Sequence, residues 1–420
     1  MRKAKNIFDN IDYISILLYY LLIIFGALNI FASQYNEDSN TFFDFSKRYG
    51  KQIIFMIIAS FFALIILIID WKFYYSLSYI FYIIGIILLI GVLFLGNKVG
   101  GATSWFNIGS FKFQPSEIAK FITALAVAKY YNGIHNKNIS IYQKIKVYAF
   151  IGLPFILIIL QNDLGTAIVF SSFLLVLYRE GLSGNILILG LIIITLFICS
   201  LLIENIILIS ILVTISLIFI LLSKKNKKEI IIIIFLLISA VGFIHSVNYI
   251  FNNILSDHHR QRINILLGKE IDPYGAGYNL IQSKIAIGSG GTFGKGFLNG
   301  TQTRFDFVPE QSTDFIFCTI GEEWGFMGSF IFCIMYVTLL LRILFLSERQ
   351  RSNFSRIYGY SVASILFIHF FINIGMTIGL VPVIGIPLPF ISYGGSSLIG
   401  FTILLFIFLN LDSYRLQILR

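Results

Sequence analysis

Charged residues are scarce in this sequence, and their scarcity limits what the protein can be. Asp, Glu, Lys and Arg together make up 12% of the 420 residues, whereas 57% are hydrophobic. A soluble domain carries more charge on its surface, so we exclude a soluble globular protein. The hydrophobic residues form a series of long runs rather than one patch, which indicates a polytopic membrane protein.

Cysteine and histidine are also rare, with three and five residues, respectively. The cysteines lie in apolar runs without a Cys-x-x-Cys motif or a Cys/His cluster, so the sequence predicts neither a disulfide framework nor a zinc site. No histidine has a metal-ligand partner at helical spacing. We identify no cofactor and no metal ligands, although a divalent cation stays an open alternative.

Two other features are missing. No Gly-x-Ser-x-Gly sequence occurs, which leaves nucleophilic catalysis by serine without support. No internal repeat or low-complexity linker divides the chain, so we expect residues 1–420 to form a single membrane domain. The net charge is +10. Because the basic residues gather in short connections, where they set the orientation of helices in a membrane, we predict no nucleic-acid partner.

The apolar runs have the length of membrane-spanning helices. Each covers about 17–25 residues, and none shows the short alternating pattern of barrel strands. Backbone polar groups in lipid must be paired within the protein, which a helix achieves by itself. The predicted fold is an all-α polytopic membrane protein with about 10–12 transmembrane helices. The candidate runs lie near residues 13–33, 50–69, 76–95, 116–131, 146–161, 164–178, 186–203, 205–222, 229–247, 314–342, 356–380 and 394–410.

Positive charge gives these helices a direction. With the basic N-terminus in the cytoplasm, nearly all connections on the same side are basic, and the C-terminal tail joins them. The segment SKRYGK (residues 46–51) is an exception, because it is basic and lies outside. Only Glu204 and Asn205 interrupt the stretch 186–222, where we expect a helical hairpin, with one long tilted helix as the alternative. The first run is too long for a signal peptide, so we expect a retained helix.

One outside connection, residues 248–312, is far longer than the others. It contains several cations and the glycine-rich stretch IGSGGTFGKG. The cations are either simply hydrated or bind an anionic headgroup, since Arg and Lys are the natural partners of phosphate. Its segment YNLIQSKIAIG (residues 278–288) is amphipathic. This pattern predicts a short helix at the membrane surface, with Ile281, Ile285 and Ala286 buried and Lys284 turned towards a cavity.

Several ionisable residues lie at or near membrane depth, where such groups are costly and usually functional. Glu117 and Lys120 are three residues apart and can pair on one helix face. This pair either orients its helix at the interface or lines a polar cavity. Asp163 lies at the outer end of another run. In a straight helix, Glu322 would lie about 12 Å deeper than Asp314, so we expect it to bond to neighbouring helices.

Asp314 stands where a polar loop becomes a long apolar run, in the sequence DFVPEQSTDFIF. Together with Glu117 and Asp163 it would form a rim of carboxylates at the outer end of a helix bundle. Such a rim suits a lipid-linked anionic substrate, with one carboxylate as general base on a sugar hydroxyl. The stretch 373–400 contains three prolines and the sequence YGG, which indicates a broken or re-entrant segment.

Several blocks of the sequence resemble the SEDS family of polytopic membrane proteins, and within it the RodA branch. They occur in the family's order between about residue 100 and residue 400. The long block from the outside connection is the most specific, and its GKGFLNGTQTRFDFVPE is similar to RodA rather than to its division-specific sister FtsW. The blocks are FKFQPSEIAKF, QNDLGTAI, DPYGAGYNLIQSKIAIGSGGTFGKGFLNGTQTRFDFVPEQSTDFIF, GEEWGFMG and NIGMTIGLVPVIGIPLPFISYGGSSL.

The resemblance implies a SEDS-type helix bundle with one large extracytoplasmic loop. It implies a glycosyltransferase that polymerises lipid II into glycan strands on the outer face of the bacterial cytoplasmic membrane. RodA-type members serve cell elongation together with a class B penicillin-binding transpeptidase. By the same resemblance, Asp314 of the TDF motif is the catalytic base, and Glu117 and Lys120 of the PSE-x-x-K motif are functionally important.

The sequence departs from the family at several positions. Gln311 and Ser312 stand where a basic residue and a histidine usually precede TDF, which leaves Asp314 as the candidate base. Asn162 replaces a proline of the usual QPDLG, so the local helix geometry is open. Ser104 replaces a common arginine, and Lys112 stands where arginine is frequent. The family usually has ten helices, so twelve runs imply an extra pair within residues 186–247.

Two other functions remain as hypotheses. A lipid II flippase would need a polar path through the membrane midplane, whereas the candidate residues cluster near the outer face. A scaffold that only activates its transpeptidase gives no reason for an acid at position 314. For the leading hypothesis, Asp314 is catalytic, and Lys or Arg side chains stabilise the departing pyrophosphate. The predicted substrate-binding residues are Trp105, Lys112, Glu117, Lys120, Asp163, Lys284, Lys295 and Arg304, and the expected partners are lipid II, the growing glycan strand, the transpeptidase and membrane lipids.

Overall fold

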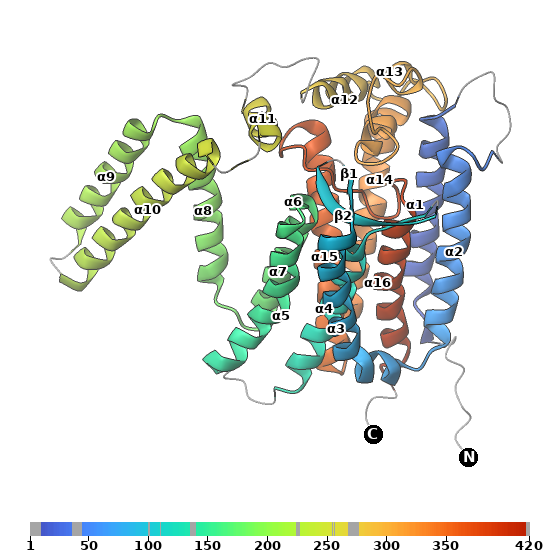
Figure 1. The fold of residues 1–420 in the computed structure, drawn as a ribbon, viewed down its shortest axis with the longest axis horizontal. Coiled ribbons are helices and arrows are strands. Elements are labelled where there is room, and N and C mark those ends of the chain that lie inside the picture. Colours follow the sequence, from blue (N-terminus) through green and yellow to red (C-terminus); the bar gives the residue numbers. More distant parts are fainter. Residues whose placement is uncertain are drawn as a thin grey trace. The chain divides into compact units, whose positions relative to one another are not determined.

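The computed structural model of the chain is almost entirely helical (Figure 1). Its contacts divide the chain into two compact units. Unit 1 comprises residues 1–180 and 279–420, and unit 2 comprises residues 181–278. The expectation of a single domain stays a prediction. The structure describes residues 10–35, 44–99, 101–109, 111–134, 140–223, 227–253, 255, 257–267 and 277–416.

Unit 1 holds most of the helices and a small sheet. Its helices begin at residues that favour helix starts, such as Pro115 at the first position of α4 and Asp12, whose side chain accepts a hydrogen bond from the Ser15 N–H at the start of α1. The helices are α1 (Tyr13–Ala32), α2 (Arg48–Ile68), α3 (Trp71–Leu95), α4 (Pro115–Asn132), α5 (Ile141–Leu160), α6 (Leu164–Val169), α7 (Ser172–Arg179), α12 (Tyr278–Ser289), α13 (Thr301–Arg304), α14 (Ile316–Glu348), α15 (Asn353–Ile378) and α16 (Gly395–Ser413), where α12 begins one residue before the unit boundary.

All twelve predicted runs correspond to helices in the described residues. Ten of these helices are long and apolar enough to cross a membrane, and the remaining two runs form α4 and the shorter pair α6 and α7. The stretch 186–222 breaks at Ile203 and Glu204 into two helices, which confirms a break there rather than one long helix. The lysine-rich connection after it lies partly outside the described residues, at 224–226.

The spans of the two units differ in how much of their surface is covered. In unit 1, α16 has 89% and α15 has 67% of its most apolar window buried. Polar residues on these helices therefore face other protein groups. In unit 2, the corresponding share is only 6–11% for α8, α9 and α10. Their isoleucine-rich surfaces suit lipid, which needs no specific packing. The helices of unit 2 are α8 (Gly184–Leu202), α9 (Asn205–Leu222), α10 (Lys227–Asn253) and α11 (Asp257–Leu266).

A three-stranded antiparallel sheet, which the sequence did not predict, connects α3 to α4. Its strands are β1 (Asn97–Val99), β2 (Ala102–Ile108) and β3 (Phe111–Phe113). Asn107 lies opposite Lys112, and Trp105 lies opposite Asn97. Paired residues share a face of the sheet, and so do residues two apart on a strand. Trp105 and Lys112, both predicted site residues, therefore lie on the same face.

The described part of the outside connection contains several helices, which distinguishes it from an extended, flexible spacer. Its first residues extend α10, and α11, α12 and α13 follow, although residues 268–276 lie outside the described part. The predicted amphipathic helix is confirmed as α12. Ala286 is buried as predicted, but Ile285 is 46% exposed and Ile281 only half-buried. The helix instead buries Leu280 and Ser283, because Ser283 donates a hydrogen bond to the Thr377 carbonyl of α15.

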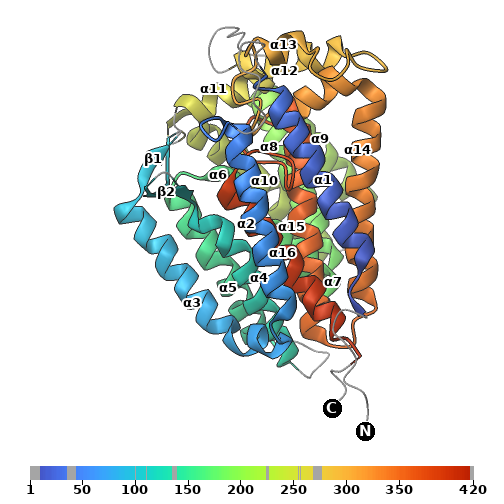
Figure 2. The ribbon, with the colours of Figure 1, turned by 90° about the vertical axis from the view of Figure 1, so that its right-hand side faces the viewer.

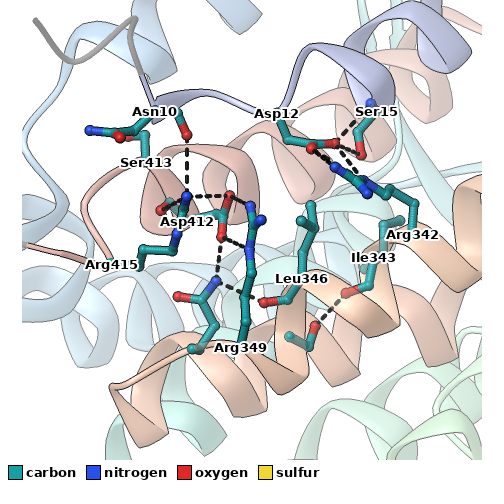
Figure 3. Close-up of polar contacts among 12 residues, drawn as sticks. Asn10, Asp12, Ser15, Arg342, Ile343, Leu346, Arg349, Asp412, Ser413 and Arg415 are labelled. Carbon is teal, nitrogen blue, oxygen red and sulfur yellow. Dashed lines mark hydrogen bonds and ion pairs between the residues drawn. The ribbon is translucent and has the colours of Figure 1, made fainter.

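The two ends of unit 1 can be told apart in Figures 1 and 2. α1 begins and α16 ends at one end, and α12 and α13 lie at the other. At the first end, which we call the terminal end, Asp412 and Asp12 accept hydrogen bonds from arginines of α14 and its C-terminal turn (Figure 3). At the other end, α14 is kinked at Gly325, whose φ of 63° is left-handed.

Candidate active site

Asp314 lies in the turn that precedes α14, and this turn is bonded to the broken segment predicted from its prolines. That segment follows α15 and runs without helix from residue 380 to residue 394. The hydroxyl of Ser392 donates to the Thr313 carbonyl at 2.5 Å, and the Tyr393 N–H donates to the Ser312 carbonyl at 2.8 Å. The broken segment therefore holds the backbone of the two residues that precede Asp314.

Gly385 of the broken segment lies close to the Asp314 carboxylate. A Cβ atom at Gly385 would lie 3.2 Å from Oδ2 of Asp314, and its φ of 79° is in the left-handed region. Both properties favour glycine, which has no side chain to crowd the carboxylate. The side chain of Asp314 is neither fully buried nor fully exposed. A base at this place can reach a ligand from the end of the bundle.

Glu117 and Lys120 form the predicted pair, which confirms their contact. Lys120 Nζ lies 2.8 Å from Oε2 of Glu117, and the two side chains are 2% and 3% exposed. The pair is therefore inside the protein and not at a lipid interface. The Lys120 ammonium also lies 4.2 Å from the centre of the Phe401 ring, which is a favourable cation–π distance. The sequence did not predict the third neighbour of Lys120, which is His369 of α15. Nε2 of His369 lies 3.1 Å from Lys120 Nζ.

Asp163, the third predicted carboxylate, caps a helix. It accepts hydrogen bonds from the backbone N–H and the hydroxyl of Thr166 at the start of α6. Its Oδ2 also accepts from the amide of Gln114, whose backbone N–H donates to Ser396 at the start of α16. These bonds join α4, α6 and α16. They give Asp163 a structural role, while substrate binding stays a prediction.

The residue before Asp163 explains one departure from the family pattern. Asn162 has a φ of 59°. Proline cannot adopt a positive φ, because its ring fixes φ near −65°. Asparagine is among the few residues other than glycine that accept the left-handed region. The turn between α5 and α6 in this chain therefore requires a residue other than proline.

Lys295 and Glu322 form an ion pair at 2.6 Å in the outside connection. Glu322 is fully buried, and its carboxylate also accepts the backbone N–H groups of Thr301, Gln302 and Thr303 at the start of α13. As expected, Glu322 bonds to a neighbouring helix, but that helix is α13 of the outside connection. The kink at Gly325 separates the first turns of α14 from the rest of that helix, and these turns face the loop instead.

The remaining predicted site residues, three cations and one tryptophan, lie on the same loop and on the sheet. Lys284 of α12 is exposed, with its Nζ near Gly379 at the end of α15. Lys112 of β3 is exposed, and Trp105 of β2 is half-buried. The Arg304 guanidinium lies 6.0 Å from the Tyr35 ring. The binding roles of these four residues stay predictions.

Arg48 is a cation of the site that sequence reasoning noted only as an exception to the charge pattern. It lies at the start of α2, and its Nη1 donates to the Ser312 hydroxyl at 2.8 Å. The guanidinium also lies 3.4 Å from the Glu310 carboxylate and 5.9 Å from the Tyr393 ring. A positive charge thus reaches the turn of Asp314 from another helix, next to the neutral Gln311. The signal that could have found it was the unusual outside position of SKRYGK.

Metal-ligating side chains and cavities were compared with the position of this site. Among the described residues, no group of three or more His, Cys, Asp or Glu side chains is arranged to hold a metal ion. A cavity of about 340 Å³ lies within unit 2, between the 200–205 turn and residues 248–252 of α10. None of the predicted site residues lines it. The chemistry indicated by Asp314 therefore belongs to unit 1.

Comparison with known proteins decides the family. Residues 12–207 and 185–417 match the family model of the cell cycle proteins FtsW, RodA and SpoVE. The chain belongs to this family. The two matches overlap at residues 185–207, at the beginning of the stretch 186–247 in which the sequence predicted an extra pair of helices.

Among curated relatives, the chain is 37% identical over 325 residues to the peptidoglycan glycosyltransferase MrdB of Escherichia coli K12, covering 76% of this chain and 73% of the relative. It is 30% identical to the peptidoglycan glycosyltransferase RodA of Treponema pallidum, covering 93% and 94%. Both relatives carry the name of an enzyme that builds peptidoglycan.

Two solved structures share the fold. One is a chain of a peptidoglycan synthase complex that coordinates polymerization and crosslinking, with a TM-score of 0.70, 25% identity, and coverage of 97% of this chain and 99% of that chain. The other is the rod shape determining protein RodA of Thermus thermophilus, with a TM-score of 0.63, 22% identity, and coverage of 96% and 97%. These similarities confirm the predicted SEDS-type helix bundle.

Proposed function

We propose that this protein is a RodA-type peptidoglycan glycosyltransferase, which polymerises lipid II into glycan strands for cell elongation. The observation that carries the proposal is the placement of Asp314. It lies at the end of an apolar bundle, in a turn whose backbone at Ser312 and Thr313 is bonded to the broken segment. A substrate with its lipid in the bilayer and its sugars just above the hydrocarbon meets the carboxylate there.

In this reaction, Asp314 acts as general base. The carboxylate takes the proton of the acceptor sugar's 4-hydroxyl while that oxygen attacks the anomeric carbon of the donor. The new bond between oxygen and carbon forms as the bond from the anomeric carbon to the phosphate oxygen breaks. The electron pair of the broken bond leaves with undecaprenyl pyrophosphate. A positioned base of this kind typically contributes about 10²–10⁴ in rate.

Cations near the site would stabilise the departing pyrophosphate. The predicted binding residues Lys112, Lys284, Lys295 and Arg304 are candidates, and Arg48 joins them because it already lies at the Asp314 turn. Lys295 is bonded to Glu322 and would act by fixing the loop. The Glu117–Lys120 pair, which is buried below the rim, would support the geometry of the site. We place this site on the outer face of the bacterial cytoplasmic membrane, beside a class B penicillin-binding transpeptidase.

The test is polymerisation of lipid II by the purified protein in detergent, with and without the transpeptidase, followed by separation of the products by length. Glycan strands that disappear on digestion with a muramidase support the proposal. A protein that carries fluorescent lipid II across a vesicle membrane but makes no polymer would instead be a flippase. If the transpeptidase preparation alone makes as much polymer when this chain is left out, the polymer comes from the partner, and the proposal is contradicted.

A further inference from the structure

α15 carries two buried polar residues, His369 and Asn373, on the face towards the broken segment. They are four residues apart, so they lie on one face of the helix. His369 is 1% exposed and Asn373 is fully buried. Buried polar side chains on a membrane helix need partners within the protein. Their partners connect Asp314, the broken segment and the Glu117–Lys120 pair.

Asn373 bonds to the backbone of Asp314 itself. Its Nδ2 donates to the Asp314 carbonyl at 2.8 Å and to the Ile386 carbonyl at 2.7 Å. Both partners are carbonyl oxygens, which only accept, so the orientation of the amide is fixed. One amide group therefore determines where the residue that carries the base sits relative to the broken segment.

His369 bonds in two directions. Its Nε2 lies 3.1 Å from Lys120 Nζ, and its Nδ1 lies 3.2 Å from the Pro387 carbonyl. An ammonium group only donates and a carbonyl only accepts, which assigns the neutral ring with its proton on Nδ1. The ring also packs edge-on against Phe401, at 4.8 Å between centroids. His369 thus links the Glu117–Lys120 pair to Pro387. This residue directly follows Ile386, whose carbonyl accepts a hydrogen bond from Asn373.

We propose that His369 and Asn373 are positioning residues for the glycosyl transfer. Together they fix the backbone of Asp314 and of residues 386–387 relative to the Glu117–Lys120 pair. Neither side chain touches the reacting atoms. The consequence for rate rests on the proposed function, because a displacement of about 1 Å at a catalytic group can lower a rate about 10²-fold.

Substitutions at the two positions separate positioning from packing. Asn373→Leu removes both donors at similar volume, and His369→Leu removes the bridge. His369→Gln offers an oxygen to Lys120 and an N–H to Pro387, so it is the conservative variant. Ser361→Ala is the matched control, because Ser361 is equally buried on α15 and its hydroxyl donates only to the Ile357 carbonyl of its own helix.

We expect Asn373→Leu to lower the kcat of lipid II polymerisation about 10- to 100-fold, with a KM within about two-fold of the parent. The loss should be absent in an Asp314→Asn background, because that variant has no base whose position could affect the rate. His369→Leu should lower kcat, and His369→Gln should restore it with the parent's pH profile. A changed pH profile in His369→Gln would make His369 a proton-transfer group and overturn its positioning role.

Hydrogen exchange gives a readout that needs no activity. The amides of Leu388, Ile391, Ser392 and Tyr393 are all hydrogen-bonded in the broken segment or to the Asp314 turn. They should exchange at least about ten-fold faster in Asn373→Leu and His369→Leu, and at the parent's rate in Ser361→Ala. Unchanged exchange in both leucine variants would overturn the inference. If the parent makes no glycan while exchange changes as expected, the proposed function fails and the positioning stands.

Discussion

The two ends of unit 1 both carry buried or half-buried carboxylates, but they use them differently. At the terminal end, Asp412 is fully buried and receives two bonds from Arg349, at 3.1 and 2.6 Å, and one from Arg415 (Figure 3). Asp12 is held in a similar way by Arg342. Burial raises the pKa of Asp12, but hydrogen bonds from Arg342 and Ser15 outweigh it and lower that pKa.

At the Asp314 end, the contacts are made by the backbone. The turn of Asp314 is held by Ser392, Tyr393 and Asn373 through carbonyl groups, and its carboxylate lies against Gly385, which has no side chain. Bidentate arginine pairs use both oxygens of a carboxylate and leave it little capacity for chemistry. The comparison shows arginine pairs on the carboxylates of the terminal end, whereas at the other end hydrogen bonds position the backbone of the turn that carries Asp314.

The largest expected effect is on catalysis at the Asp314 end. Asp314→Asn keeps the size of the side chain and removes its basicity, so we expect lipid II polymerisation to fall about 10²–10⁴-fold. The backbone contacts of the turn remain, so the midpoint of unfolding in SDS should stay near that of the parent. Near-normal glycan synthesis by the folded variant would remove Asp314 from the role of base.

The Glu117–Lys120 pair should affect both activity and stability. Glu117→Gln or Lys120→Met leaves one charge buried without its partner, which typically costs about 3–5 kcal/mol. The double variant should be less damaged than the sum of the two, with a coupling energy of about 1–3 kcal/mol in a double-mutant cycle. Unfolding and polymerisation are measured for all four proteins, and strict additivity would reject the coupling.

Asp412→Asn should reverse the pattern of Asp314→Asn. We expect a loss of about 2–3 kcal/mol in stability, less than for a fully buried pair because Arg349 and Arg415 are partly exposed. The polymerisation rate per folded molecule should stay at the parent's value. A large loss of rate without a loss of stability would show that the terminal end takes part in the chemistry and would break the comparison.

Lys284 and Lys295 test the outer loop. We expect Lys295→Gln to weaken the bond to Glu322 and loosen α13, at a cost of about 1–2 kcal/mol, and to slow polymerisation more than it weakens lipid II binding. Lys284→Gln, on the exposed side of α12, should weaken lipid II binding instead. Binding and polymerisation are measured separately for each variant. If both variants behave like the parent, the cations are merely hydrated, and Lys112 becomes the next candidate.

The smallest effect is expected in unit 2. Thr195 of α8 is exposed, and its hydroxyl donates only to the Leu191 carbonyl of its own helix. Thr195→Val should change stability by no more than about 0.5 kcal/mol and leave polymerisation unchanged. A strong effect on activity, measured in the same assay, would mean that this helix has a partner or a role that its lipid-like surface does not indicate.

The sequence predicted the spans well because span length and hydropathy reflect the bilayer directly. It predicted the contact between Glu117 and Lys120 because helical spacing alone places them together. It failed where the backbone leaves regular structure. The kink at Gly325 turned Glu322 towards the loop, and the sheet of β1 to β3 consists of strands of three to seven residues, which have too little periodicity to be recognised.

Contacts between distant segments were also outside the reach of sequence patterns. His369 and Arg48 lie 249 residues from Lys120 and 264 from Ser312, respectively, and no spacing rule connects such positions. His369 had no partner at helical spacing on its own helix, so no role could be assigned to it from the sequence. Ile285 of α12 was predicted to be buried but is exposed. Hydropathy could not show this, because in a membrane protein an exposed isoleucine can face lipid.

The central claim is that the reaction takes place at the Asp314 end of the bundle without lipid II crossing the membrane. The direct measurement uses proteoliposomes in which the protein has one orientation and lipid II is supplied only to the leaflet at that end. We predict glycan strands and released undecaprenyl pyrophosphate with the parent, about 10²–10⁴-fold slower formation of both with Asp314→Asn, and no lipid II in the opposite leaflet. Transfer of lipid II to the opposite leaflet by both proteins, without polymer, would contradict the account.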